Sequence, residues 1–330
     1  MSSRRGLVIG VLSLILLGSK VATATGQVES WVREGWKTDF SRTLVDFEEV
    51  MSGGPPRDGI PPIDDPIFIP ARDVVDLDGR EPVILFPLEG ESRAYPLRVL
   101  TWHEIVNDEI DGQPVAVTYC PLCNAAIVFD RRADGETLSF GTTGKLRHSD
   151  LIMYDRSTES WWQQFSGEAI VGDFVGTDLT MLPSRIVSFA DFLGAHPDGL
   201  VLVPNDPAAR PYGNNPYQSY DTAQRPFLFR GELPPDIPAM AHVVVVETDS
   251  EPIIVSLNRI RQSPLQLRGY SFSYKTGVAS ALDTATISDG RDIGSVRVTR
   301  DGQDVVHNLT FAFVAHVFHP DVAIIDADAH

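Results

Sequence analysis

Residues Pro114–Asp130 read PVAVTYCPLCNAAIVFD. Two runs rich in β-branched, aromatic and small apolar residues, Pro114–Tyr119 and Ala125–Asp130, flank the tetrad Cys-Pro-Leu-Cys. Short apolar runs of this kind are typical of buried strands. Because proline fixes φ and removes a backbone donor, the tetrad favours a turn. The stretch therefore predicts a β-hairpin with Cys120 and Cys123 at its tip.

Similar runs elsewhere predict a mainly β protein with short helices, an α+β fold. Apolar spacing and flanking prolines predict two helices, over Pro96–Val106 and Phe189–Ala195. The Gly- and Pro-rich segment that ends near residue 65 has no regular pattern and is expected to wrap the surface. Further strands are expected over Pro82–Phe86, Leu151–Tyr154, Ala169–Val175 and Leu200–Val203.

Parts of the sequence pattern recur after residue 225, which predicts two related β-rich lobes from an internal duplication. The recurring pairs are residues 83–97 with 243–257, 126–130 with 280–283, and 196–198 with 319–321. The second copy is shortened and has no cysteine, so we expect any chemistry in the first. The predicted divisions are a wrapping segment (25–65), a first repeat with the CPLC site (66–203), a linker (204–225) and a degenerate second repeat (226–330).

The N-terminus predicts export. Arg4 and Arg5 precede an apolar run over Leu7–Leu17 and a small-residue stretch over Val21–Ala24. This order is typical of a signal peptide, here over residues 1–24, and the run is short for a membrane span. We therefore expect a periplasmic or extracellular protein, with an uncleaved membrane anchor as the alternative.

Composition narrows the class of protein. The chain has 330 residues, 43% of them hydrophobic, which is typical of a globular protein. Its 45 acidic and 27 basic residues give a net charge of −18, so nucleic acid is not an expected partner. Two cysteines cannot hold a chain of this length together, so stability must come from a hydrophobic core.

The Cys120-x-x-Cys123 pair has three interpretations. The first is a redox or nucleophilic site, which needs a thiolate of lowered pKa. The second is a knuckle for a transition metal such as zinc or copper, with His103 and His148 as the nearest candidates for further ligands. The third is an inert structural disulfide, which an oxidising compartment would permit. Glu104, beside His103, is expected to be solvated.

A second set of residues predicts a non-catalytic small-ligand site. The glycines and basic residues of segment 141–147 suggest a hairpin turn or a backbone nest for an anion. Adjacent tryptophans in a strand point to opposite faces, so one is expected in the core and the other at the floor of a pocket. The candidate ligand-binding residues are Lys145, Arg147, Ser149, Asp150, Tyr154, Trp161 and Trp162.

Several of these strings together resemble a known family. They are WHEIVND (102–108), YCPL (119–122), GKLR (144–147), SDL (149–151), MYDR (153–156) and WWQQ (161–164). They are similar to the bacterial and archaeal family catalogued as DUF3179, a domain of unknown function. The resemblance covers most of the chain after residue 38 and implies no particular reaction. It does imply that Cys120, rather than Cys123, is the group shared with the family.

Overall fold

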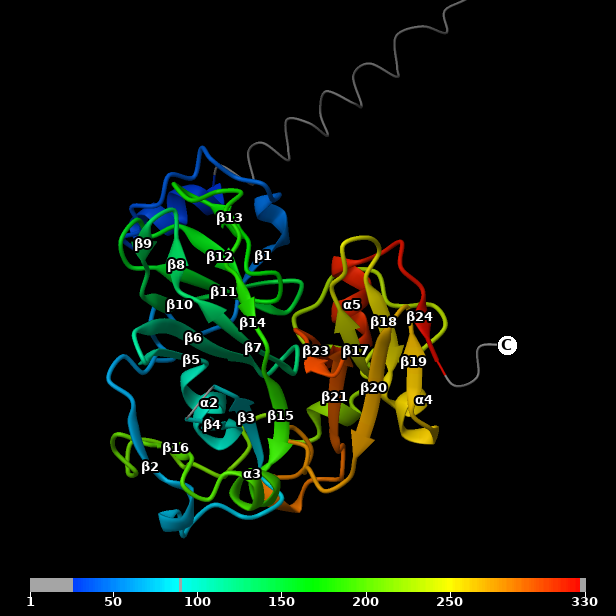
Figure 1. Ribbon diagram of the computed structural model, residues 1–330. Coiled ribbons are helices and arrows are strands. Elements are labelled where there is room, and N and C mark those ends of the chain that lie inside the picture. Colours follow the sequence, from blue (N-terminus) through cyan, green and yellow to red (C-terminus); the bar gives the residue numbers. More distant parts are fainter. Residues whose placement is uncertain (1–25, 89–90, 327–330) are drawn as a thin grey trace, which may run out of the picture.

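The computed structural model describes residues 26–88 and 91–326, so the predicted signal peptide over residues 1–24 lies outside the described residues. Strands dominate and the helices are few and short, which confirms the predicted mainly β fold. Within these ranges the strands form five sheets of four or five strands and one two-stranded sheet. The chain gathers into two lobes, residues 26–203 (blue to green) and residues 242–326 (yellow to red) (Figure 1). None of the described helices is long and apolar enough to cross a membrane.

The predicted hairpin lies at the centre of the first lobe, in a sheet of order β14-β7-β6-β5. Its strands are β5 (Ile105–Ile110), β6 (Gln113–Cys120), β7 (Ala125–Asp130) and β14 (Met181–Leu182). β6 and β7 are antiparallel, with Cys120 opposite Ala125, as predicted. Nearly every residue of β6 is buried, which explains its apolar run without alternation.

A second sheet of the first lobe joins the N-terminal segment to the chain after the hairpin. Its strands are β1 (Val50–Ser52), β10 (Phe140–Arg147), β11 (Asp150–Asp155), β12 (Trp161–Gln163) and β13 (Ala169–Val171). β1 pairs antiparallel with β10. The rings of Trp31 and Trp36 lie 4.9 and 5.3 Å from that of Trp161. The N-terminal segment therefore supplies an edge strand and part of a core.

One sheet in each lobe has the same strand order and the same strand directions. In the first lobe, β3 lies between its antiparallel neighbours β15 and β4, and β16 runs parallel to β4. In the second lobe, β17 lies between β23 and β18, and β24 runs parallel to β18. The first set is β3 (Pro82–Phe86), β4 (Arg93–Pro96), β15 (Arg185–Ser188) and β16 (Leu200–Val203), with β2 (Ile67–Pro70) at its edge. The second set is β17 (His242–Val246), β18 (Ile253–Ser256), β23 (Asn308–Phe311) and β24 (Ile324–Ile325).

Short helices follow corresponding strands of these two sheets. They are α2 (Leu97–His103) after β4, α4 (Leu257–Gln262) after β18, α3 (Phe189–Ala195) after β15 and α5 (Ala312–Phe318) after β23. The remaining strands are β8 (Arg132–Ala133), β9 (Glu136–Thr137), β19 (Leu265–Leu267), β20 (Tyr270–Lys275), β21 (Ser295–Arg300) and β22 (Gln303–Asp304). Single 3-10 turns are η1 (Phe47–Glu49), η2 (Ala71–Asp73), η3 (Tyr220–Thr222) and η4 (Ile287–Asp289).

The two lobes share one hydrophobic core. β23 lies beside β7, and β21 lies beside β15. The largest cluster of buried apolar side chains includes Phe129 of the first lobe and Phe311 of the second. Segment 204–225, predicted as a linker, packs against the second lobe, where the Tyr220 backbone N–H donates to the Leu282 carbonyl at 3.0 Å. The core therefore continues across the lobe boundary.

Two local predictions were wrong. The helix predicted over Pro96–Val106 ends at His103, because Glu104 has a φ of +58° and Ile105 begins β5. Segment 141–147 is no hairpin turn but strand β10, with a bulge between Thr142 and Lys145. Gly144 lies in that bulge at a φ of +70°, where a Cβ would collide with the Pro55 carbonyl, so the glycine serves a close backbone approach.

Candidate functional site

The Cys-Pro-Leu-Cys tetrad forms a tight turn at the tip of the β6–β7 hairpin, as predicted. The Cys123 N–H donates to the Cys120 carbonyl at 3.2 Å, and Asn124 closes the turn with a φ of +50°. Both side chains are free thiols, so the disulfide, one of the three interpretations of this pair, is not formed. The two Sγ atoms approach one acceptor, the Ser149 carbonyl oxygen, at 3.7 Å from Cys120 and 3.5 Å from Cys123. The turn therefore presents both sulfurs to the same side.

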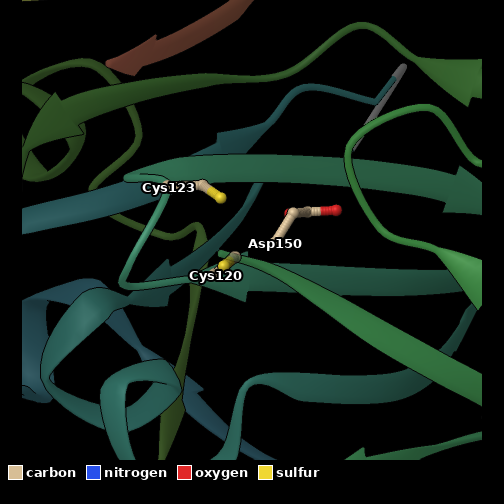
Figure 2. Close-up of side chains that lie close together, drawn as sticks. All are labelled: Cys120, Cys123 and Asp150. Atoms are coloured by element: carbon tan, nitrogen blue, oxygen red, sulfur yellow. The ribbon is translucent and has the colours of Figure 1, made fainter. Parts of the chain in front are cut away.

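The turn between β10 and β11 brings a carboxylate to the two thiols. His148 and Ser149 have φ values of +56° and +65°, and this left-handed pair directs the next residue, Asp150, inward. A carboxylate oxygen of Asp150 and the two Sγ atoms all lie within 4.8 Å of one another (Figure 2). The sequence placed Asp150 in the ligand-binding set, and the structure places it beside the cysteines.

Burial controls the electrostatics of these three side chains, which we call the Cys–Asp cluster (Cys120, Cys123 and Asp150). Each is at most 2% exposed. Desolvation raises the pKa of Asp150 to about 6, although hydrogen bonds from Gln163 Nε2 and the Phe165 N–H oppose the shift. Desolvation likewise raises the pKa of both thiols. The second carboxylate oxygen, Oδ1, is buried and has no hydrogen-bond partner in the described part of the chain.

Glu104 is a second buried carboxyl near the cluster, and sequence reasoning missed it. It is 7% exposed, not solvated as expected, because the left-handed residue after α2 turns inward to meet β6. Its carbonyl accepts from the Tyr119 N–H at 2.8 Å. Desolvation, followed by repulsion from Asp150, raises the pKa of Glu104 to about 8. Two carboxyls and two thiols thus share one poorly solvated region.

The second lobe and segment 204–225 cover the Cys turn from outside. The Cys123 carbonyl accepts from Thr310 Oγ1 at 2.8 Å and from the Phe311 N–H at 3.2 Å. The Leu122 carbonyl accepts from the Tyr220 hydroxyl at 3.0 Å. All three of these contacts are hydrogen bonds from residues far away in the sequence. The Cys–Asp cluster therefore lies at the junction of the lobes, rather than on an open surface.

The two histidines predicted as metal ligands are not in the cluster. His103 Nδ1 lies 2.7 Å from the Pro61 carbonyl oxygen, and its Nε2 lies 2.7 Å from the Tyr212 hydroxyl. His148 Nε2 lies 3.5 Å from a carboxylate oxygen of Glu49. Burial, followed by the charge of Arg147, lowers the pKa of His148 to about 4. Both rings contact other partners. The prediction that they join the cysteines, which rested on nearness in sequence, was therefore wrong.

The basic residues predicted for ligand binding form ion pairs with the N-terminal segment. Lys145 Nζ lies 2.6 Å from Glu34 Oε2 and 6.0 Å from the ring centroids of three tryptophans. Arg147 Nε lies 2.6 Å from Glu49 Oε2. The Lys145 ammonium and the Arg147 guanidinium are therefore both paired, and both ion pairs connect β10 to the wrapping segment.

The remaining candidates also serve the fold. Ser149 Oγ donates to the Phe227 carbonyl at 2.5 Å, and the Tyr154 hydroxyl donates to Asp58 Oδ2 at 2.5 Å. Trp161 and Trp162 point to opposite faces as predicted, but both are completely buried in separate core clusters. Neither ring has an exposed surface, because each face of β12 is covered by described residues.

These observations define the class of protein: a mainly β, two-lobed protein with a buried thiol–carboxylate site between sequence-distant turns. A family model described as "Protein of unknown function (DUF3179)" matches residues 57–322. The chain therefore belongs to the DUF3179 family, as its motifs indicated. No curated protein and no solved structure shows a significant match to it.

Proposed function

We propose that this chain binds one transition metal ion, such as zinc or copper, through the Cys120 and Cys123 thiolates and the Asp150 carboxylate. The observation that carries the proposal is the approach of these three ligand atoms within 4.8 Å in a fully buried place. Three acidic groups buried together are unfavourable when ionised unless a cation neutralises them. A bound cation would also give Asp150 Oδ1 the partner it lacks among the described residues.

The donor types suit a borderline-soft metal. Thiolates favour zinc, copper(I) and iron over magnesium or calcium, and zinc accepts a carboxylate beside them. A fourth donor is at hand in the Ser149 carbonyl oxygen, which both thiols already approach. Gln163 and the Phe165 N–H hold Asp150 from behind, as groups around a metal ligand commonly do.

The raised thiol pKa values argue against nucleophilic chemistry at this site. A reactive cysteine needs a lowered pKa, and burial here does the opposite. A metal ion displaces the thiol protons directly, so the metal supplies the missing charge compensation. The arrangement therefore supports a bound ion better than an attacking thiolate.

The test is a calorimetric titration of zinc into the reduced, chelator-treated chain. The proposal expects one ion per chain, with affinity at least about tenfold weaker in Cys120→Ser and in Asp150→Asn. Asp130→Asn is the matched control, because Asp130 is a buried carboxylate at the opposite end of the same hairpin and pairs with Arg132. Unchanged affinity in both cluster variants would refute the proposal.

A second candidate function is dithiol–disulfide exchange. The observation that favours it is a pair of free thiols in one tight turn, which share a single acceptor. In such a reaction an external disulfide takes up two electrons and two protons as the Cys120–Cys123 bond forms. Thiol counting before and after treatment with oxidised glutathione separates the candidates. Protection of both thiols by stoichiometric zinc favours the metal, and rapid oxidation in its presence favours exchange.

We further propose that the two lobes arose by duplication, with loss of part of the second copy. The equivalent order β3-β4-α2, then β15-α3-β16, against β17-β18-α4, then β23-α5-β24, supports this. So do the residues after α3 and α5, His196 and His319, whose backbone angles agree within 3°. Superposition of these two units in an experimental structure tests the idea. Units that superpose only with altered strand order would contradict it.

Export remains part of the proposal. The charged start, apolar run and small-residue stretch of residues 1–24 support a cleaved signal peptide. Fractionation of cells that make the full chain should place it outside the cytoplasm and shortened near residue 24. A full-length chain in the membrane fraction would favour the anchor instead.

A further inference from the structure

A cavity of about 450 Å³ lies beside α2, and no residue of the Cys–Asp cluster lines it. Its walls come from β2, the loop after η2, α2, β16 and the start of segment 204–225. Most of the wall is aliphatic, and examples are Ile69, Val74, Leu77, Val99, Val201 and Leu202. A volume of this size and an apolar lining are typical of small-molecule sites.

One of the charged side chains at this cavity lacks an ion-pair partner among the described residues. Arg98 is neutralised by Glu81, whose two carboxylate oxygens lie 2.7 and 2.6 Å from its Nε and Nη2 atoms. Asp76 Oδ2 lies 3.7 Å from Arg98 Nη1 in a weaker ion pair, and because the Asp76 side chain is 80% exposed, water screens its charge. Arg210, in contrast, is half-buried and forms no hydrogen bond or ion pair with its side chain in residues 26–88 and 91–326. The cavity therefore offers one unneutralised guanidinium.

Arg210 stands on a fixed support. The Tyr212 N–H donates to the Arg210 carbonyl at 2.9 Å, with Pro211 between them. The Tyr212 hydroxyl meets His103 Nε2, while His103 Nδ1 meets the Pro61 carbonyl. Because a carbonyl can only accept, Nδ1 carries the ring proton and Nε2 accepts from the tyrosine. This chain of bonds fixes the turn before any ligand arrives, which reduces the entropic cost of binding.

We propose that this cavity binds a small aliphatic or aromatic carboxylate, with its hydrocarbon part against the aliphatic wall and its carboxylate on Arg210. A guanidinium suits this ligand because it can bind a carboxylate through two parallel hydrogen bonds. The walls contribute by removing apolar ligand surface from water. The site is independent of the metal proposal, because it shares no residue with the Cys–Asp cluster.

Octanoate is the probe, and its binding to the full chain is measured by calorimetry. Arg210→Gln should weaken octanoate binding at least about tenfold, because the guanidinium that would pair with the carboxylate is lost. Arg230→Gln is the matched control, since Arg230 is exposed and does not line the cavity. Octanol, which has the same chain without the charge, should bind more weakly than octanoate and equally to both variants.

Two results would overturn the assignment. One is octanoate binding that is unchanged by Arg210→Gln, and the other is equal binding of octanol and octanoate to the unmodified chain. Folding does not confound the test, because the replaced guanidinium has no partner within the described chain and melting temperatures of both variants are compared directly.

Discussion

The backbone carbonyl of Cys123 accepts a hydrogen bond from the side chain of Thr310 at 2.8 Å, across 187 positions of sequence. The next residue, Phe311, donates its N–H to the same oxygen at 3.2 Å. A turn that carries both thiols is thus fixed by a strand of the other lobe. The geometry of the cluster therefore depends on how the two lobes pack. The same two hydrogen bonds also stabilise the contact between the lobes.

Removal of the Thr310 hydroxyl tests this dependence. Thr310→Val should lower the free energy of unfolding by about 1 kcal/mol, the net value of one such hydrogen bond, and should weaken zinc binding. Thr299→Val is the matched control, because Thr299 lies on β21 and is only half-buried. Urea unfolding measures the first effect and calorimetry the second. Equal stability of the two variants would contradict the role given to Thr310.

Metal binding should release protons. At pH 7 both thiols are protonated, since burial raises their pKa values, and Asp150, with a pKa of about 6, is partly protonated. Zinc displaces these protons, so at least about two per ion should appear, and affinity should rise steeply with pH. Calorimetry in buffers of different ionisation enthalpy counts them. Binding without proton release would show that the thiolates are not ligands.

His242 predicts how stability changes with pH. Burial, followed by the charges of Arg291 and Arg261, lowers its pKa to about 3, against about 6.5 in the unfolded chain. Between these values the unfolded state binds more protons, so this contribution to stability is full above pH 6.5 and is lost as the pH falls. Its slope is up to about 1.4 kcal/mol per pH unit.

Comparison of the native chain with His242→Gln isolates that slope, because the other groups titrate alike in both. Urea unfolding at several pH values from 7 down to 4.5 should show the smaller pH dependence in the variant. Parallel curves would mean that His242 is not the buried neutral group described.

Gly144 should be intolerant of any side chain. Gly144→Ala combines a positive φ with a collision against the Pro55 carbonyl, so a loss of about 3 kcal/mol or more is expected. Gly135→Ala is the matched control: its φ of +84° is similar, but a Cβ there meets nothing within 4 Å, so only about 1 kcal/mol should be lost. Thermal unfolding compares them, and equal losses would remove the close approach as the cause.

The sequence predicted the bounds of helices and strands well where residues close together in the sequence determine them. β3, β7, β16 and α3 have the predicted bounds, because apolar runs there end at turn or cap residues. The helix after Pro96 was predicted too long, because nothing in the sequence shows that Glu104 adopts a positive φ. The conformation there is imposed by the meeting of α2 with β6, which is a tertiary effect.

Only part of the candidate site could be predicted from the sequence, because tertiary packing determines the rest. The Cys-Pro-Leu-Cys spacing itself indicates two thiols on one turn. Asp150 joins them because the β10–β11 turn lies against that tip, a relationship set by sheet packing and invisible to spacing. His103 and His148 were chosen for nearness in sequence, yet each faces a different partner. Burial of Glu104 likewise follows from packing.

Cobalt(II) can report on thiolate ligation at the Cys–Asp cluster through its absorption spectrum. Cobalt(II) is added to the reduced chain and the absorption spectrum is recorded for the native protein, Cys120→Ser, Cys123→Ser and the Asp130→Asn control. We expect an intense thiolate-to-cobalt charge-transfer band at one ion per chain, weakened in each cysteine variant and unchanged in the control. No such band in the native protein, or a band of unchanged intensity in both cysteine variants, would contradict a metal site at Cys120, Cys123 and Asp150.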